Sequence, residues 1–168
     1  MSAAPSPSTL NVTAIAAVNG SSVFECWALD PGFVSSAQPG TAGASSLQLG
    51  ALANASYSIL PPRFNAGRHN APNVQFVVFL SGLAHITLPN STAEAWVAGG
   101  RNGVLVAVDT PDVSALGHIT EYPSGDETLA LQIPTANGTI PGHKLVHAGP
   151  CQTELQLQRR GASLEELD

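Results

Sequence analysis

The chain has 168 residues, a formal net charge of −6 and only 11% charged side chains, where an average soluble domain has about a quarter. Six basic residues are too few to neutralise a row of phosphates, so we expect no nucleic-acid partner. No apolar run approaches the roughly 20 residues that cross a bilayer, so we expect no membrane span. The length suits one domain over residues 1–168.

Short apolar or alternating runs, separated by 16 glycines and 13 prolines, predict an all-β chain. We expect an N-terminal arm over 1–20, a barrel over 20–158, and a charged tail over 159–168 that forms a short helix or frays. Residues 35–46 read as a flexible surface loop. The expected strands, in chain order, are 23–29, 56–60, 74–81, 83–88, 95–98, 104–109, 118–122, 128–133, 144–147 and 153–157.

Two turn signals predict hairpins. The run 74–80 is apolar on both faces with Gln75 as its one polar member, and Ser81-Gly82 then leads into an alternating run. This pattern indicates a hairpin whose first strand is buried. Arg101-Asn102-Gly103 predicts a second hairpin turn.

Five Asn-x-Ser/Thr sequons occur where the composition predicts about one or two by chance, and this excess favours a eukaryotic secretory route over coincidence. The first residues lack the apolar core of a signal peptide, so we expect a mature, extracellular form with an added Met1. Two cysteines in such a chain suggest one disulfide, Cys26 to Cys151, the alternative being two buried thiols. The sequon asparagines are Asn11, Asn19, Asn54, Asn90 and Asn137.

A glycine and proline framework covers about 65 residues, from Arg68 to Gln132. Gln75-x6-Gly82 has the spacing E-x6-G, with His69 or its neighbours upstream of it. A second segment has the spacing G-x5-P-x-G-x2-H-x3-N, with Thr128 and Gln132 at the last two positions. These spacings resemble the two motifs of the cupin superfamily, although the leading glycine of the first motif is missing. The resemblance implies an antiparallel β-barrel or jelly roll of about eight to ten strands.

Metal-binding cupins hold Fe, Mn, Ni or Zn with two histidines, a glutamate and a further histidine. The matching positions here are His69 with Ala71 (or Arg68 with Asn70), then Gln75 and Thr128. Neutral Gln and Thr oxygens are poor ligands for a transition metal, so we expect neither a metal nor another cofactor. The same polar groups in an apolar cavity would suit a small-molecule pocket.

Other histidines and aromatic residues are further candidates. His85 and His118 lie on alternating strands, and either could face the barrel interior; Tyr122 shares a strand face with His118. A rebuilt metal site from His85, His118 and His147 is an alternative without supporting spacing. His143 and His147 share a strand face; they are either polar surface residues or part of a functional site. Phe79 and Trp96 are candidates for the wall and mouth of the pocket.

The arginines Arg63 and Arg68 lie beside His69 in the sequence. An arginine there could bind an enolate or carboxylate oxygen with two parallel hydrogen bonds, and the alternative is a solvated loop.

The chain resembles small secreted fungal cupin-like proteins of natural-product pathways, of the hetero-Diels–Alderase type. That resemblance implies a metal-independent enzyme that steers the cyclisation or cycloaddition of a small apolar metabolite, chemistry that needs positioning and hydrogen-bond donors. One alternative is a secreted barrel that binds a small molecule or a sugar without catalysis; another is a metal-dependent oxygenase or isomerase with atypical ligands. A homodimer through an edge strand is also expected. The candidate catalytic residues are His69, Gln75, Arg68, His118 and Thr128, and the candidate substrate-binding residues are Arg63, His85, Phe79, Tyr122 and Trp96.

Overall fold

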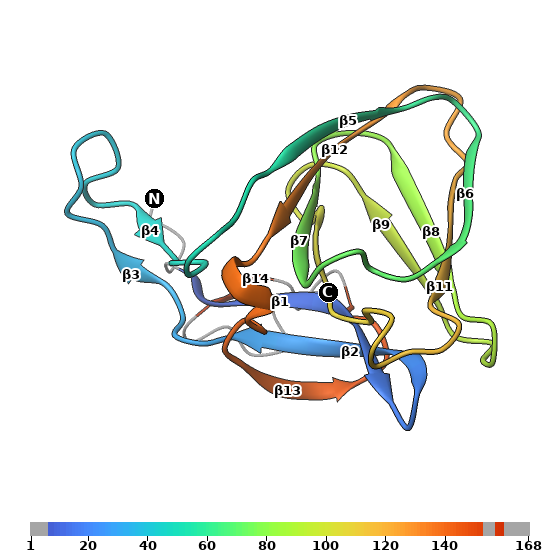
Figure 1. Ribbon diagram of the computed structural model, residues 1–168. Helices are drawn as coiled ribbons and strands as arrows, with labels where there is room; N and C mark the ends of the chain where they lie inside the picture. The colour runs from blue at the N-terminus through green and yellow to red at the C-terminus, as the bar shows by residue number, and fades with distance from the viewer. Residues whose placement is uncertain (1–6, 153–156, 160–168) are drawn as a thin grey trace.

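The computed structural model describes residues 7–152 and 157–159, and within them it is built almost entirely of β-strands (Figure 1). No helix in this part of the chain is long and apolar enough to cross a membrane. The larger sheet contains, in spatial order, β13 (His143–Ala148), β2 (Ser21–Leu29), β1 (Pro7–Val18), β10 (Val104–Ala107), β7 (Gln75–Phe79), β12 (Thr128–Pro134) and β5 (Ser56–Leu60), with β14 (Leu157–Arg159) also paired to β1. The expected all-β fold is therefore confirmed.

A smaller sheet faces the larger one and contains β6 (Phe64–His69), β11 (His118–Tyr122), β8 (Leu83–Thr87) and β9 (Glu94–Ala98), in that order. Two further short strands, β3 (Val34–Ser35) and β4 (Ser45–Ser46), pair with each other at the two ends of the expected 35–46 loop. One 3-10 turn, η1 (Ala136–Gly138), follows β12. Figure 1 shows the two main sheets enclosing a common interior.

The interior between the sheets is apolar because each sheet turns one strand face inward. In β8 and β9 the alternation is regular, with Ala84, Ile86, Ala95 and Val97 buried and their neighbours more exposed. These side chains pack against inward residues of the larger sheet, which include Ile15, Phe24, Phe79, Leu105 and Ala130. A second apolar cluster around Trp27, Phe76 and Val106 lies on the other face of the larger sheet.

The two predicted hairpins are wrong. β7 pairs with β10 and β12 in the larger sheet, whereas β8 pairs with β9 and β11 in the smaller one, so Ser81-Gly82 carries the chain from one sheet to the other. Gly82 has φ +79° and a Cβ there would overlap Thr128. Arg101–Gly103 likewise joins β9 to β10 in the opposite sheet. A glycine turn supplies the sharp bend in both cases, but it does not determine which strands pair.

The expected N-terminal arm is also wrong for most of its length. Residues Pro7–Val18 form β1, which lies between β2 and the parallel partner β10. Both faces of β1 are buried at positions such as Val12, Ala14 and Ile15, so the strand has no alternation of apolar and polar residues. Asn11 and Thr13 interrupt its apolar run and are buried as well. β6 was not expected either, since Phe64–His69 contains neither an apolar run nor β-branched residues.

Most other expected strands are found, with ends shifted by one or two residues. The expected strand 153–157 and the tail 159–168 lie almost wholly outside the described residues. The Cys26–Cys151 disulfide is confirmed and joins β2 to the segment that follows β13. Four of the five sequon asparagines are exposed, but Asn11 is only 2% exposed within β1, so this folded structure has no room for a glycan there.

Candidate functional site

A cavity of about 250 Å³ lies between the two main sheets. Five of the candidate residues line it, namely His69, Gln75, Phe79, His118 and Tyr122. The walls are otherwise mostly apolar, with Ile15, Ala71, Pro72, Val77, Ile86, Leu105 and Ala107, and the remaining polar lining residues are Thr120 and Gln132. An apolar cavity with a few polar groups is the usual form of a small-molecule site.

His69 and His118 form the polar end of this cavity. They are directly opposite each other on the antiparallel strands β6 and β11, and their ring centroids lie 4.5 Å apart in an edge-on arrangement. Strand pairing therefore holds two imidazoles side by side at the wall of an apolar space.

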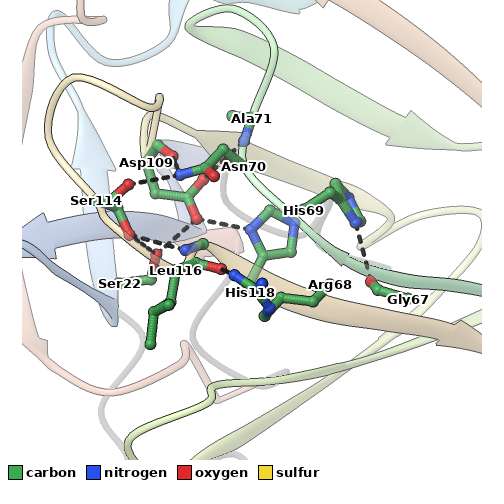
Figure 2. Close-up of polar contacts among 11 residues, drawn as sticks. Ser22, Gly67, Arg68, His69, Asn70, Ala71, Asp109, Ser114, Leu116 and His118 are labelled. Atoms are coloured by element: carbon green, nitrogen blue, oxygen red, sulfur yellow. Dashed lines mark hydrogen bonds and ion pairs between the residues drawn. The ribbon is translucent and has the colours of Figure 1, made fainter.

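Asp109 lies behind His118, two residues after the end of β10. The Nδ1–H of His118 donates to Oδ2 of Asp109 at 2.7 Å, and both side chains are buried. Figure 2 shows the His118 ring between Asp109 and the ring of His69. An ionised carboxylate can only accept a hydrogen bond, so the proton of this contact is on Nδ1. The contact fixes the orientation of the ring and leaves Nε2 for chemistry.

Asp109 is itself held by a chain of hydrogen bonds. Its Oδ2 accepts from the Ser22 hydroxyl at 2.7 Å, and Ser22 Oγ lies 2.8 Å from Ser114 Oγ. The Gly117 N–H donates to Ser114 Oγ at 3.1 Å. The side-chain amide of Asn70 donates to the backbone oxygens of Asp109 and Ser114, at 3.0 and 2.8 Å (Figure 2). The loop that carries Asp109 is thus tied to β2, to the residue after β6 and to the start of β11.

His69 has a different surrounding. Its Nδ1 lies 3.0 Å from the Gly67 carbonyl oxygen, which can only accept, so the proton of the neutral ring is on Nδ1 and the lone pair is on Nε2. Burial and the nearby His118 lower the pKa of His69 below its ordinary value of 6.5. His69 is therefore neutral at pH 7 and suited to accept a proton.

Tyr122 and Gln132 complete the polar lining. Burial raises the pKa of Tyr122 to about 12, so its phenol stays protonated and is a hydrogen-bond donor at neutral pH. Gln132 Oε1 accepts a hydrogen bond from the Ser58 hydroxyl at 2.7 Å.

His85 and Trp96 do not line the cavity. They lie on the face of the smaller sheet that is turned away from it, where the indole is 54% exposed and stacks on the imidazole at 3.8 Å. His85 Nε2 is 2.7 Å from Glu94, and this hydrogen bond lowers the pKa of the exposed Glu94 carboxyl. Their neighbours Ile86, Ala95 and Val97 point inward because side chains alternate along a strand.

Both candidate arginines also lie outside the cavity. Arg68 alternates with His69 on β6, so its exposed side chain points outward and donates to the Leu116 carbonyl at 3.0 Å. Arg63 borders a separate surface hollow that it shares with Tyr122.

Thr128 is fully buried at the crossover between the sheets, where its Oγ1 accepts from the Leu83 N–H at 3.2 Å and its backbone packs against Gly82. This threonine supports the fold and does not reach the cavity. The cupin metal positions therefore do not fit a metal in this chain, since Thr128 is separated from His69 and Gln75.

No group of three or more His, Cys, Asp or Glu side chains within 7–152 and 157–159 could hold a metal ion. The alternative set His85, His118 and His147 is not brought together. His143 stacks on Trp27 on β2, away from the cavity.

Three residues around His118 were not predicted from the sequence, namely Asp109, Ser22 and Ser114. Ser22 is distant from His118 in the chain, and the other two lie in the loop that precedes it. Asp109 closes an apolar run that ends in a single acid, which is the one signal that could have marked it. Gln132 holds the last position of the second motif, a position that predicts no role for it.

Comparison of the chain with protein-family models, with curated proteins and with solved structures found no match. The resemblance to cupins therefore stays a prediction that rests on the residues quoted for it.

Proposed function

We propose that the protein is an enzyme that binds a small apolar molecule between its two sheets and moves a proton with His69 and His118. The observation that carries this proposal is the pair of imidazoles at the wall of an apolar cavity, one of them backed by a buried carboxylate. Perturbed titratable groups in a cavity are typical of catalytic sites.

The two rings have distinct roles. His118 is the acid, because the Asp109 carboxylate stabilises the positive charge that its ring carries when Nε2 is protonated. His69 is the base, because burial keeps it neutral and its Nδ1 proton is engaged by the Gly67 carbonyl. The two rings thus have different surroundings, one beside a carboxylate and one beside a backbone carbonyl, and such a difference is how acid and base are assigned in many active sites.

The reaction class follows from the resemblance to fungal natural-product proteins: a cyclisation or cycloaddition of hetero-Diels–Alder type that needs no metal. The cavity supports it by holding the reactant in a fixed geometry, by excluding water and by offering hydrogen-bond donors to developing charge on oxygen. The disulfide and four exposed sequons support a secreted protein.

The test is deletion of the gene in its host, identification of the metabolite that accumulates, and incubation of that metabolite with purified protein. We expect turnover, and we expect His69→Ala and His118→Ala to lower it by about a hundredfold or more while the chain stays folded. His85→Ala, on the outer face, is the matched control and should keep full activity.

Each alternative has its own outcome. A stoichiometric complex without rate enhancement would make the protein a carrier. Activity that is lost on chelation together with a stoichiometric metal would make it a metal-dependent enzyme. Turnover that is unchanged in both histidine variants would place the active site elsewhere.

A further inference from the structure

We propose that the cavity recognises an uncharged ligand through a carbonyl oxygen, which accepts hydrogen bonds from the side-chain amides of Gln75 and Gln132. These two amides belong to the larger sheet and face the His69–His118 pair of the smaller one. The ligand class can be tested by binding alone; its consequence for catalysis rests on the proposed function.

Gln75 is the first observation. Its side chain is only 7% exposed, it lines the cavity, and within the described residues it makes no side-chain hydrogen bond. The Gln75 amide is not among the enclosed polar atoms that lack a partner, so it opens into the cavity. An amide that faces a mostly apolar cavity has to be satisfied by water or by a ligand, and an apolar residue there would need neither. A glutamine at this position is therefore explained by a partner that comes from outside the chain.

Gln132 is the second observation. The strand register places it opposite Val77 on the neighbouring strand, and Val77 shares the inward face of β7 with Gln75. The two amides are thus diagonal neighbours on one face of the sheet. The Ser58 hydroxyl takes one of the two lone pairs of Gln132 Oε1, so the Nε2 group, which can only donate, is the unoccupied half of this amide. Its complement on the ligand is an acceptor such as a carbonyl oxygen.

The charge of the lining indicates an uncharged ligand. The titratable lining residues are His69, His118 and Tyr122, and Arg63 and Arg68 are not among them. Asp109 is buried behind His118 and is not a lining residue. A carboxylate or phosphate in this cavity would have no permanent cation to pair with, and its desolvation would be costly.

A ligand with such a carbonyl has an acidic C–H bond on the neighbouring carbon, from which His69 can remove a proton. Nε2 of His69 takes a proton from the carbon next to the carbonyl, the electron pair of that C–H bond forms a carbon–carbon double bond, and the carbonyl oxygen becomes an enolate. The Gln75 and Gln132 amides stabilise the negative charge on that oxygen. Protonation of the enolate oxygen by His118 then gives an enol, an electron-rich alkene that can enter a cyclisation. The step needs no oxidant or reductant.

The first experiment compares the affinity of two probes of similar shape, the ketone carvone and its deoxygenated counterpart limonene, by calorimetric titration. A purely apolar cavity would bind limonene more tightly, because limonene is the less water-soluble of the two. We expect carvone to bind about tenfold more tightly than limonene. Tighter limonene binding, equal affinities or no carvone binding would overturn the proposal.

Variants locate the effect. Gln75→Leu and Gln132→Leu should each reduce the preference for carvone, because each removes one of the two donors to the ketone oxygen, and the double variant should abolish it. Gln38→Leu, in the exposed turn between β3 and β4, should change nothing. Leucine is close to glutamine in size, and far-ultraviolet circular dichroism and urea unfolding of each variant check that the fold is kept. A carvone preference that survives both cavity variants would refute the assignment.

A second readout separates this inference from the proposed function. Exchange of the hydrogens next to the carvone carbonyl in heavy water, followed by proton NMR, reports enolate formation, and we expect His69→Ala to abolish the exchange above background. Carvone preference without exchange would uphold the ligand class and count against the acid–base role. Exchange without carvone preference would uphold the acid–base role and reject the amide pair.

Discussion

Gly117 lies directly against the backbone of His69, and a Cβ at Gly117 would overlap the His69 carbonyl oxygen. Gly117 also has φ +67°, a region that other residues adopt only with strain. It precedes His118, so the close approach of these two backbones brings the imidazole pair together. The glycine of the second motif is therefore required by geometry.

We expect Gly117→Ala to lower the free energy of unfolding by more than about 2 kcal/mol, because it combines the unfavourable φ with a backbone clash. The measurement is urea unfolding followed by circular dichroism. Gly138→Ala is the matched control: Gly138 has φ +64° and nothing near its Cβ position, so this variant should cost only about 1 kcal/mol. Equal losses in the two variants would show that the contact with His69 is unimportant.

Asp109→Ala should lower the free energy of unfolding by about 2 to 3 kcal/mol, because it leaves the buried Nδ1–H of His118 without its acceptor and removes one partner of the Ser22 hydroxyl. Chemical denaturation measures this loss. Asp112→Asn, an exposed position in the same loop, should change stability by less than about 0.5 kcal/mol. A loss as small for Asp109→Ala as for the control would contradict the hydrogen-bond chain described for this loop.

The pKa of His69 is lowered on folding, so at pH values between the folded and the unfolded pKa the unfolded chain binds a proton that the folded chain does not. His69 therefore contributes to folding stability above pH 6.5, the pKa of the unfolded chain, and this contribution is lost as the pH falls from 6.5 through the folded pKa. Urea unfolding at about pH 7.5 and about pH 5.5 should therefore show lower stability in acid, and His69→Gln should reduce the difference. His147→Gln is the control and should keep the full dependence; identical behaviour of the two variants would count against the assignment.

Asn11 should carry no glycan in folded protein secreted by a eukaryotic host, because its side chain is enclosed in the larger sheet. We expect glycans only at Asn19, Asn54, Asn90 and Asn137, which are exposed. Peptide mass spectrometry after enzymatic release of the glycans identifies the occupied sites. A glycan on Asn11 in folded, monodisperse protein would contradict the position of β1.

The sequence predicted the strands whose pattern is simple. β8 and β11 alternate, and β7 is an apolar run bounded by a glycine turn, so their existence and approximate ends could be read directly. Which strands pair could not be read, because Ser81-Gly82 has the same chemistry in a hairpin and in a crossover between sheets. β1 was not predicted because it is buried on both faces, so it does not alternate, and because Asn11 and Thr13 interrupt its apolar run.

The candidate site could be predicted only in part, because a motif spacing does not tell where a side chain points in the fold. His69 and Gln75 were predicted from a motif spacing and His118 from its place on an alternating strand, and all three line one cavity. Thr128 satisfies the same spacing but lies at the crossover, since a spacing fixes position along a strand and not its direction in space. Asp109 was missed because it reaches His118 through tertiary structure, and no local pattern marks that contact.

The parallel pairing of β1 with β10 has a consequence for how the chain acquires its structure. Thr13 pairs with Leu105, so the second edge of β1 stays open until the chain has been synthesised beyond β10. Such distant pairing slows folding, and an open apolar strand edge can pair with other chains in the meantime. A fragment that ends before β10 should therefore aggregate, even though it contains the whole of β1 and β2.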